Sequence, residues 1–411
     1  MLECRKQVLI ITYVYPPDNY VGAARPHRFV KYLRRRGFAV RVLSSAAVGA
    51  CSTVDDIYRV RGEIEHAPSR TGWFWTEWLI RQLALPYDEG ITWVPRVTRL
   101  VRKWEHEGIY ANSPPVLIST SPPLTTHLAA LMLKRRFGWQ WIADFRDPVI
   151  GNPCRGPKSA RMDAYLEGLY FRHADALIAN TDAVAVMWKH RRPEWSDKIH
   201  VIYNGFDPEI LTPALPLPER TRRVLSHVGN LYGGRYPSAL FRSFERLISS
   251  GKLDPDGILL RMAGPASEPR DRDGSHRWIE FLPGQLPRRE AERVAAESDW
   301  LLLLDFDTPL LGDHPGLQVP AKLYDYLGVG RPILACTRKG SPVQYVLERA
   351  GVPYRCFFRG APDEENDRSV LDFLQLPSEP VATSQWFDQN FHPAAQAEQL
   401  EKIIAGLTTG C

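Results

Sequence analysis

The chain has 411 residues, more than one ordinary hydrophobic core holds, so two domains are predicted. The hydrophobic fraction of 44% and the charged fraction of 24% are typical of a soluble globular protein, and no apolar run approaches the ~20 residues of a membrane-spanning helix. The net charge of +5 permits nucleic acid, a phosphorylated ligand or an anionic membrane surface as a partner and selects none of them.

The cellular compartment is predicted from the N-terminus and the cysteines. The first segment, MLECRKQVLIITYVYPP, has a short apolar run without a small-residue cleavage site, which favours a first strand over a signal peptide. The six cysteines include no C-x-x-C pair, which argues against a disulfide framework or a zinc site. We therefore expect a cytoplasmic protein.

Strand and helix patterns alternate along the first half, which predicts a parallel sheet covered on both faces. Strands are expected at 7–13, 38–44, 57–67, 116–120, 139–145, 176–179 and 200–203. Helices are expected at 25–36, 124–137, 160–173 and 183–190, with a Trp-rich helical region ending near 107.

The proline-rich segment 207–223 is the predicted linker, after which the alternation restarts. Strands are expected at 224–228, 258–263, 279–282, 300–304, 332–335 and 354–358, and helices at 236–249, 288–297, 320–327, 343–350 and 394–407. The predicted division is 1–206, linker 207–223, 224–385 and a C-terminal helix in 386–411. The predicted fold class is α/β, with two Rossmann-like, doubly wound domains that face each other across a cleft.

The region 73–104 interleaves tryptophan with basic residues. Its tryptophans lie among arginines and a lysine: Trp73, Trp75, Trp78, Trp93 and Trp104, with Arg81, Arg96, Arg99, Arg102 and Lys103. Such a pattern suits a peripheral membrane contact, and it equally suits an aromatic core with solvated arginines. Both interpretations stay open.

Several common catalytic motifs do not occur. The chain has no G-x-G-x-x-G after its first strand, no P-loop, no G-x-S-x-G and no H-E-x-x-H, which disfavours dehydrogenases and P-loop NTPases. Asp305 and Asp307 form a D-x-D that could bind a divalent metal and a diphosphate, although such a pattern is common by chance.

Glycine-containing loops follow the first strand of each half. Gly22 and Ala23 lie in the first loop, where backbone N–H groups could approach an anion. The loop 229–235 contains three glycines, among them Gly229, and ends at Arg235, which makes it the better phosphate cradle. A plain turn is the alternative for each.

Further polar residues stand at predicted strand ends. Asp144, Arg146 and Asp147 follow a buried strand, where a charge cluster indicates either a site or an internal ion-pair network. His127, near a helix start, could act as a general base or could be structural. Asp313 and His314 lie in a polar loop and stay unassigned.

The segment VPAKLYDYLGVGRPILACT predicts a short helix, a glycine turn and a buried strand. Leu323, Tyr326 and Leu327 share one face, and Lys322 and Asp325 lie together on another side. This pair could clamp a polar ligand or form an ordinary surface ion pair.

In their order along the chain, these pieces resemble the family-4 glycosyltransferases, which have the GT-B fold. The matching segments run from about Val8 to Gly351: PPDNYVGAARPHRFVKYLRRRGFAVRVLSS, TSPPLTTHLAALMLKRRFGWQWIADFRDP, ADALIANTDA, HVIYNGFDP, HVGNLYGGRYP, RMAGPA, IEFLPGQLPRREA and VPAKLYDYLGVGRPILA. The resemblance implies hexosyl transfer from a nucleotide-sugar to a saccharide acceptor, with retention and without metal or other cofactor. It also implies a donor-binding C-terminal domain, an acceptor-binding N-terminal domain and a last helix that crosses back onto the first domain.

The setting that the family implies is cell-surface polysaccharide assembly, where acceptors are often lipid-linked. Contact with the inner face of the plasma membrane through 73–104 would fit that setting, and no nucleic-acid partner is expected. A nucleotide-sugar epimerase of the same fold and a non-catalytic nucleotide-sugar-binding protein are the alternatives.

The resemblance also assigns residues. Gly229 and Arg235 match the donor-diphosphate loop, Lys322 faces phosphate, and Phe281 and Leu282 flank the base. Asp325 stands where the family has the second acid of a pair that holds the ribose, and Leu317 stands in place of the first acid. Gly316 and Leu317 are then expected to supply backbone amides. Asp147, Arg146 and His127 are the catalytic-cleft candidates, with no nucleophile assigned, and the D-x-D is expected only to end its strand.

Overall fold

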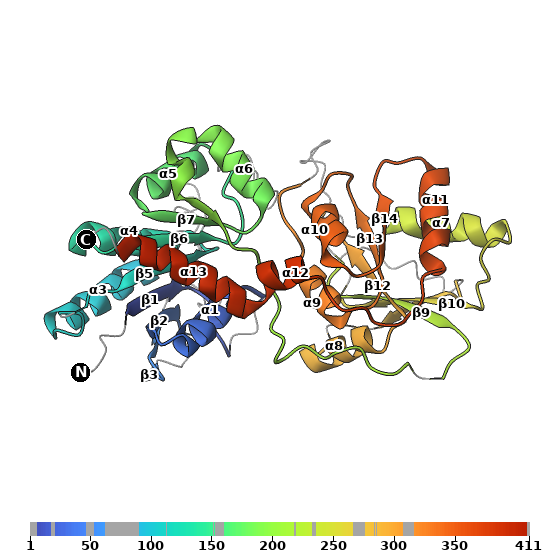
Figure 1. Ribbon diagram of the computed structural model, residues 1–411, viewed down its shortest axis with the longest axis horizontal. Helices are drawn as coiled ribbons and strands as arrows, with labels where there is room; N and C mark the ends of the chain where they lie inside the picture. The colour runs from blue at the N-terminus through green and yellow to red at the C-terminus, as the bar shows by residue number, and fades with distance from the viewer. Residues whose placement is uncertain are drawn as a thin grey trace, which may run out of the picture. The chain divides into compact units, whose positions relative to one another are not determined.

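The computed structural model describes residues 6–17, 21–46, 53–61, 90–111, 113–150, 152, 160–217, 219–231, 236–265, 276–282, 284, 286–306 and 316–408 (Figure 1). The chain divides into two compact units, unit 1 with Met1–Asn204 and Pro393–Cys411, and unit 2 with Gly205–His392. It therefore passes from one unit to the other twice, after Asn204 and after His392. Across the described ranges, no helix has both the length and the apolar character needed to cross a membrane.

Unit 1 is built on an eight-stranded sheet with the order β3-β4-β2-β1-β5-β6-β7-β8. Neighbouring strands are parallel except β3 and β4, and their bounds are β1 Gln7–Thr12, β2 Ala39–Ser45, β3 Thr53–Val54, β4 Ile57–Val60, β5 Val116–Ser121, β6 Trp141–Phe145, β7 Ala176–Ala179 and β8 Ile199–Val201. Apolar runs such as QVLIIT form the central strands because helices cover both faces of the sheet.

Apart from the C-terminal helix, the helices of unit 1 connect successive strands. They are η1 Val21–Ala23, α1 Ala24–Arg35, α3 Trp93–His106, α4 Thr125–Phe137, α5 Ala160–His173, α6 Asp182–Arg191, η4 Pro193–Lys198 and, from the end of the chain, α13 Pro393–Thr408. Helix α3 buries Trp93 and Trp104, which are 0% and 4% exposed. For these two tryptophans the aromatic-core interpretation therefore holds, whereas residues 62–89 lie outside the described ranges.

Helix α13 returns from unit 2 and packs along α1 (Figure 1). Its buried side chains recur at helical spacing, and Leu400 and Ile404 join the core formed by β1 and α1 around Ile10, Phe29 and Leu33. The C-terminal helix is thus an integral part of unit 1.

Unit 2 is built on a six-stranded parallel sheet with the order β11-β10-β9-β12-β13-β14. The strands are β9 Arg223–Val228, β10 Ile258–Ala263, β11 Ile279–Leu282, β12 Trp300–Leu304, β13 Ile333–Thr337 and β14 Tyr354–Phe358. This is the doubly wound order in which the winding direction reverses between the first and fourth strands, here β9 and β12. Their pairing is short, Trp300 with Leu225 and Leu301 with Ser226.

The helices of unit 2 are α7 Ser238–Ser249, α8 Arg288–Ala296, α9 Ala321–Val329, α10 Pro342–Ala350, α11 Asp363–Leu374 and α12 Gln385–Phe391. Helix α9 ends at Gly330, whose φ of +82° suits glycine and whose Cα faces the backbone of Val381, so a side chain there would meet the Val381 carbonyl oxygen at 2.6 Å. The ring of Tyr324 packs on Phe391 with centroids 4.9 Å apart. These contacts pack α9 against the segment that runs from Val381 to Phe391.

Candidate active site

In doubly wound sheets, ligands bind beyond the carboxyl ends of the strands at the point where the strand order reverses. In unit 2 this point lies past the ends of β9 and β12, and the loop after β9 begins with Gly229. Gly229, one of the predicted donor residues, therefore lies at this edge.

Gly229 and Lys322 lie against each other at this edge. A Cβ added to Gly229 would lie 1.6 Å from the Lys322 Nζ, so the ammonium occupies the space that any other side chain would need. The φ of +134° at Gly229 also favours glycine. The structure thus brings together two of the predicted donor residues, from the end of β9 and the start of α9.

Gly264, the first residue after β10, completes this arrangement. Its missing side chain would meet the Gly229 carbonyl oxygen at 2.3 Å, and the Gly229 N–H donates to the Ala263 carbonyl at 2.6 Å. We call Gly229, Gly264 and Lys322 the glycine–lysine seat. It combines close backbone packing with one ammonium next to the start of α9, where the helix dipole favours an anion.

The other predicted donor residues lie nearby in sequence or on the same sheet edge. Phe281 and Leu282 end β11 and are half-buried, Leu317 is 8% exposed, and Asp325 is exposed on α9. Gly316 has a φ of +95°. Their roles toward a base, a ribose or a phosphate stay predictions.

Asp305, the first acid of the D-x-D, is buried beyond β12. Its carboxylate accepts from the Thr337 Oγ1 at 2.7 Å and from the Phe306 N–H at 2.7 Å. These contacts join the ends of β12 and β13. Arg235, Asp307, Asp313 and His314 lie outside the described residues, and the described residues contain no group of three or more His, Cys, Asp or Glu side chains arranged to hold a metal ion.

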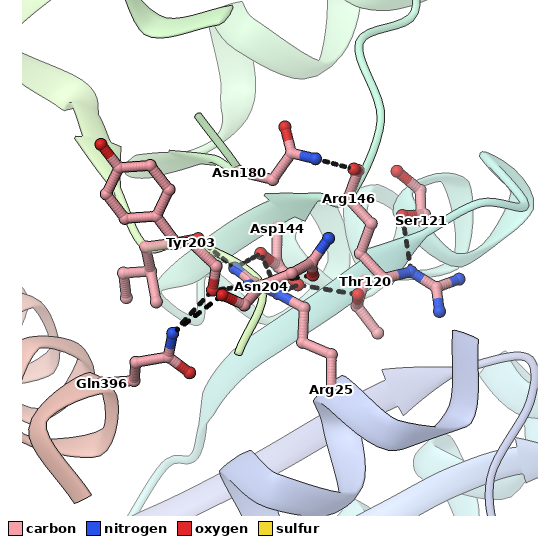
Figure 2. A network of polar contacts seen from close by, with 10 residues as sticks. Arg25, Thr120, Ser121, Asp144, Arg146, Asn180, Tyr203, Asn204 and Gln396 are labelled. Atoms are coloured by element: carbon pink, nitrogen blue, oxygen red, sulfur yellow. Dashed lines mark hydrogen bonds and ion pairs between the residues drawn. The ribbon is translucent and has the colours of Figure 1, made fainter. Parts of the chain in front are cut away.

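At the corresponding edge of unit 1, Arg25 and Asp144 form a buried ion pair (Figure 2). The Arg25 Nη2 lies 2.7 Å from Asp144 Oδ1 and the Nε 2.9 Å from Oδ2, with side-chain exposures of 2% and 0%. The Thr120 hydroxyl donates to the same carboxylate at 2.7 Å. Asp144 therefore belongs to the internal ion-pair network that the sequence left as one of two interpretations.

This network extends to the point where the chain leaves unit 1. Arg25 donates to the carbonyls of Ile202, at 2.8 Å, and Tyr203. Gln396 of α13 donates to the same Tyr203 carbonyl at 2.8 Å (Figure 2). Both segments that connect the units are thus anchored to one buried cluster in unit 1.

Arg146 has a structural role in this structure. Its Nε donates to the Ser121 carbonyl at 3.0 Å, and its other nitrogens donate to the carbonyls of Gly22 and Pro122. Asn180 in turn donates to the Arg146 carbonyl. Because Arg146 is 7% exposed and bonded to three carbonyls, we correct its catalytic assignment: it holds the Gly22–Ala23 loop against the end of β5.

His127 is likewise a core residue, which corrects its assignment to the cleft. Its exposure is 0%, and its ring lies among those of Phe145, Tyr170 and Trp141, with centroid distances of 4.3, 5.5 and 6.2 Å. The Ser119 hydroxyl lies 2.7 Å from Nδ1 and accepts from the Trp141 Nε1 at 2.7 Å. Burial lowers the pKa of His127 to about 3.

This pKa makes the stability of unit 1 depend on pH. The unfolded chain binds a proton on His127 near pH 6.5, whereas the folded chain binds it only near pH 3, so lowering the pH between these values stabilises the unfolded state. We expect wild type to lose up to about 1.4 kcal/mol of unfolding free energy per pH unit more than His127→Gln does. Urea titrations between pH 7.5 and 4.5 check this, with the exposed His106→Gln as control; equal slopes for wild type and His127→Gln would contradict it.

Two residues that shape these sites were not predicted as such. Arg25 shares the inner face of α1 with Phe29 and Leu33 at four-residue spacing, and a charge on a core-facing stripe signals a buried partner. The sequence pattern predicts Tyr326 only as part of the apolar face of its helix, yet its hydroxyl accepts from the Val228 N–H at 2.8 Å. Asp147 follows Arg146 and is half-buried, and Ala23 precedes α1 and is buried; their roles stay predictions.

Three solved structures share the fold over nearly the whole chain. Sucrose-phosphate synthase from Thermosynechococcus elongatus is 12% identical, with a TM-score of 0.66 over 99% of this chain and 100% of that one. HepE from Anabaena, in complex with UDP, is 13% identical, with a TM-score of 0.59 over 98% of this chain and 100% of that one. The lipopolysaccharide outer core galactosyltransferase WaaB is 12% identical, with a TM-score of 0.60 over 98% of this chain and 99% of that one.

A comparison with protein families matches most of unit 1. Residues 22–205 match the family described as glycosyl transferase 4-like domain. No curated protein matches the sequence. The family match and the two doubly wound sheets agree with the predicted resemblance: residues 22–205 form a glycosyl transferase 4-like domain, and the whole chain has the GT-B fold.

Proposed function

We propose that the protein transfers a hexose from a nucleotide-sugar donor to a saccharide acceptor, with retention and without a metal ion. The observation that carries the proposal is the glycine–lysine seat, where the Lys322 ammonium fills the space beside Gly229 at the strand-order reversal of unit 2. A donor diphosphate placed there would meet a fixed positive charge and the start of α9.

The chemistry of the step explains why such a seat matters. Breaking the bond between sugar and diphosphate leaves negative charge on the leaving phosphate, and a preorganised cation stabilises that charge in the transition state. We propose that Lys322 supplies this cation, together with Arg235. HepE, which shares the fold, is named as a complex with UDP, which supports a uridine nucleotide as the first donor to test.

Asp325 is proposed to hold the donor ribose. It is exposed on α9, one turn after Lys322, which leaves its carboxylate on the surface of the helix that carries the seat. Leu317 cannot accept from a ribose hydroxyl, so a single acid would replace the pair typical of the family. A 2′-deoxyribonucleotide that binds as tightly as its ribonucleotide would refute this role.

Unit 1 is proposed to bind the acceptor, with Asp147 and the Gly22–Ala23 loop as the residues to test. Assembly of a cell-surface polysaccharide on a lipid-linked acceptor is the proposed setting. The outward face of α3 carries Arg99, Arg102 and Lys103, all exposed, which suits contact with an anionic surface. Binding to anionic vesicles that survives reversal of these three charges would contradict that contact.

A ligand panel tests the proposal directly. Purified protein is heated with UDP, GDP, ADP and their hexose conjugates, because a ligand that binds the folded state raises the melting temperature. We expect one nucleotide to raise it, and the matching nucleotide-sugar then to donate to a mixture of saccharide acceptors in the presence of EDTA. The proposal fails if no nucleotide has an effect; conversion of the donor alone into an isomer would identify an epimerase instead.

A further inference from the structure

On the side of β12, side chains hold the end of strand β9, whereas on its other side β9 pairs with β10 as far as Val228 and Ala263. Strand β9 pairs with β12 at Leu225 and Ser226. Beyond these residues, the buried His227 ring donates from Nδ1 to the Leu302 carbonyl at 3.0 Å. The next residue, Val228, donates its N–H to the Tyr326 hydroxyl at 2.8 Å. The Tyr326 hydroxyl thus connects helix α9 to the end of β9, where the strand order reverses.

Tyr326 is placed to control the glycine–lysine seat. It follows Lys322 by four residues, so the two side chains are neighbours in successive turns of α9, with Tyr326 on the buried face and Lys322 at its margin. Their partners are adjacent on the chain, since Tyr326 bonds Val228 and Lys322 lies over Gly229. The Tyr326 hydroxyl therefore connects α9 to β9 next to the point where the ammonium meets the glycine.

We infer that Tyr326 is a positioning residue for donor diphosphate binding, acting through Lys322 and Gly229. The inference rests on the proposed function and adds a residue that affects the ligand through its neighbours without touching the ligand. Tyr326 is 3% exposed, and burial raises the pKa of its hydroxyl above the usual range, so the neutral hydroxyl is present at any assay pH. Without it, the Val228 N–H would lose this acceptor, a loss that favours a shift of α9.

The test compares Tyr326→Phe with Tyr324→Phe, a second buried tyrosine of the same helix whose ring packs on Phe391. The ligands are UDP and uridine, or the matching pair if the panel selects another base, and affinities are measured by calorimetry. We expect Tyr326→Phe to weaken UDP binding about tenfold and to leave uridine binding unchanged, because only the diphosphate contacts the seat. Tyr324→Phe should change neither affinity.

A double-mutant cycle separates positioning from a general loss of stability. If Tyr326 acts through Lys322, Tyr326→Phe should have no further effect on UDP affinity once Lys322→Ala is present. Additive losses, or equal losses for UDP and uridine, would overturn the inference. If wild type binds no nucleotide, the proposed function fails; if wild type binds and Tyr326→Phe binds equally well, only this inference fails.

A measurement on wild type covers the case in which Tyr326→Phe does not fold. Hydrogen exchange is followed in peptides from β9 and α9, with and without UDP or the selected nucleotide. We expect the nucleotide to slow exchange in both elements together, since Tyr326 links them. Slowing in α9 without any change in β9 would contradict the link.

Discussion

Lys322→Ala should raise the activation barrier of sugar transfer by about 2–4 kcal/mol, measured as the loss in kcat/KM. The ammonium lies at the missing side chain of Gly229, beside the start of α9, where a diphosphate would develop charge during the reaction. Lys322 is only half-buried, so its removal should leave the melting temperature nearly unchanged.

The control for this variant is Lys252→Ala, which removes an exposed lysine that follows α7 in the same unit. We expect it to keep wild-type kcat/KM. Lys322→Arg separates charge from shape, because guanidinium keeps the charge but needs more room beside Gly229. Unchanged turnover in Lys322→Ala would remove the residue from the site.

Asp144→Ala should destabilise unit 1 by about 3–5 kcal/mol, because it leaves the Arg25 guanidinium buried without its carboxylate. Both side chains are almost fully buried, and the pair also fixes the segment at Ile202 and Tyr203 through Arg25. The free energy of unfolding is measured by denaturant titration, followed in the transition of unit 1.

The matched control for Asp144→Ala is Glu107→Ala, which breaks an exposed pair with Lys103 at 3.6 Å in the same unit. Exposed pairs contribute little, and we expect a change within about 0.5 kcal/mol. Asp144→Asn keeps the volume and removes the charge, so it should lie between the two. A loss for Asp144→Ala no larger than that for Glu107→Ala would contradict the role of the buried pair.

Much of the fold could be predicted from local patterns. Apolar runs such as VLISTS and WLLLL became central strands because parallel strands buried on both faces need no alternation. Helix α11, DEENDRSVLDFL, was not predicted because it buries little more than Val370 and Phe373 and so carries a weak apolar period. Helix α12 is too short to show a period at all.

Only part of the candidate site could be predicted from the sequence. The type of a residue indicates which chemistry its side chain can perform, but packing in the folded chain decides whether that side chain is exposed to a ligand. Gly229 and Lys322 were named from loop composition and resemblance, and the structure places them in contact. His127 and Arg146 have reactive or charged side chains, yet the aromatic cluster and the loop carbonyls bury them. Tyr326 carries a polar atom at an apolar position, and only the fold shows that this atom meets Val228.

A crystal structure of the protein with the nucleoside diphosphate selected by the panel would show whether the glycine–lysine seat binds the donor diphosphate. We expect the diphosphate next to Gly229, with a phosphate oxygen about 3 Å from the Lys322 Nζ. A diphosphate bound at another edge of the sheet, out of reach of Lys322, would contradict this expectation.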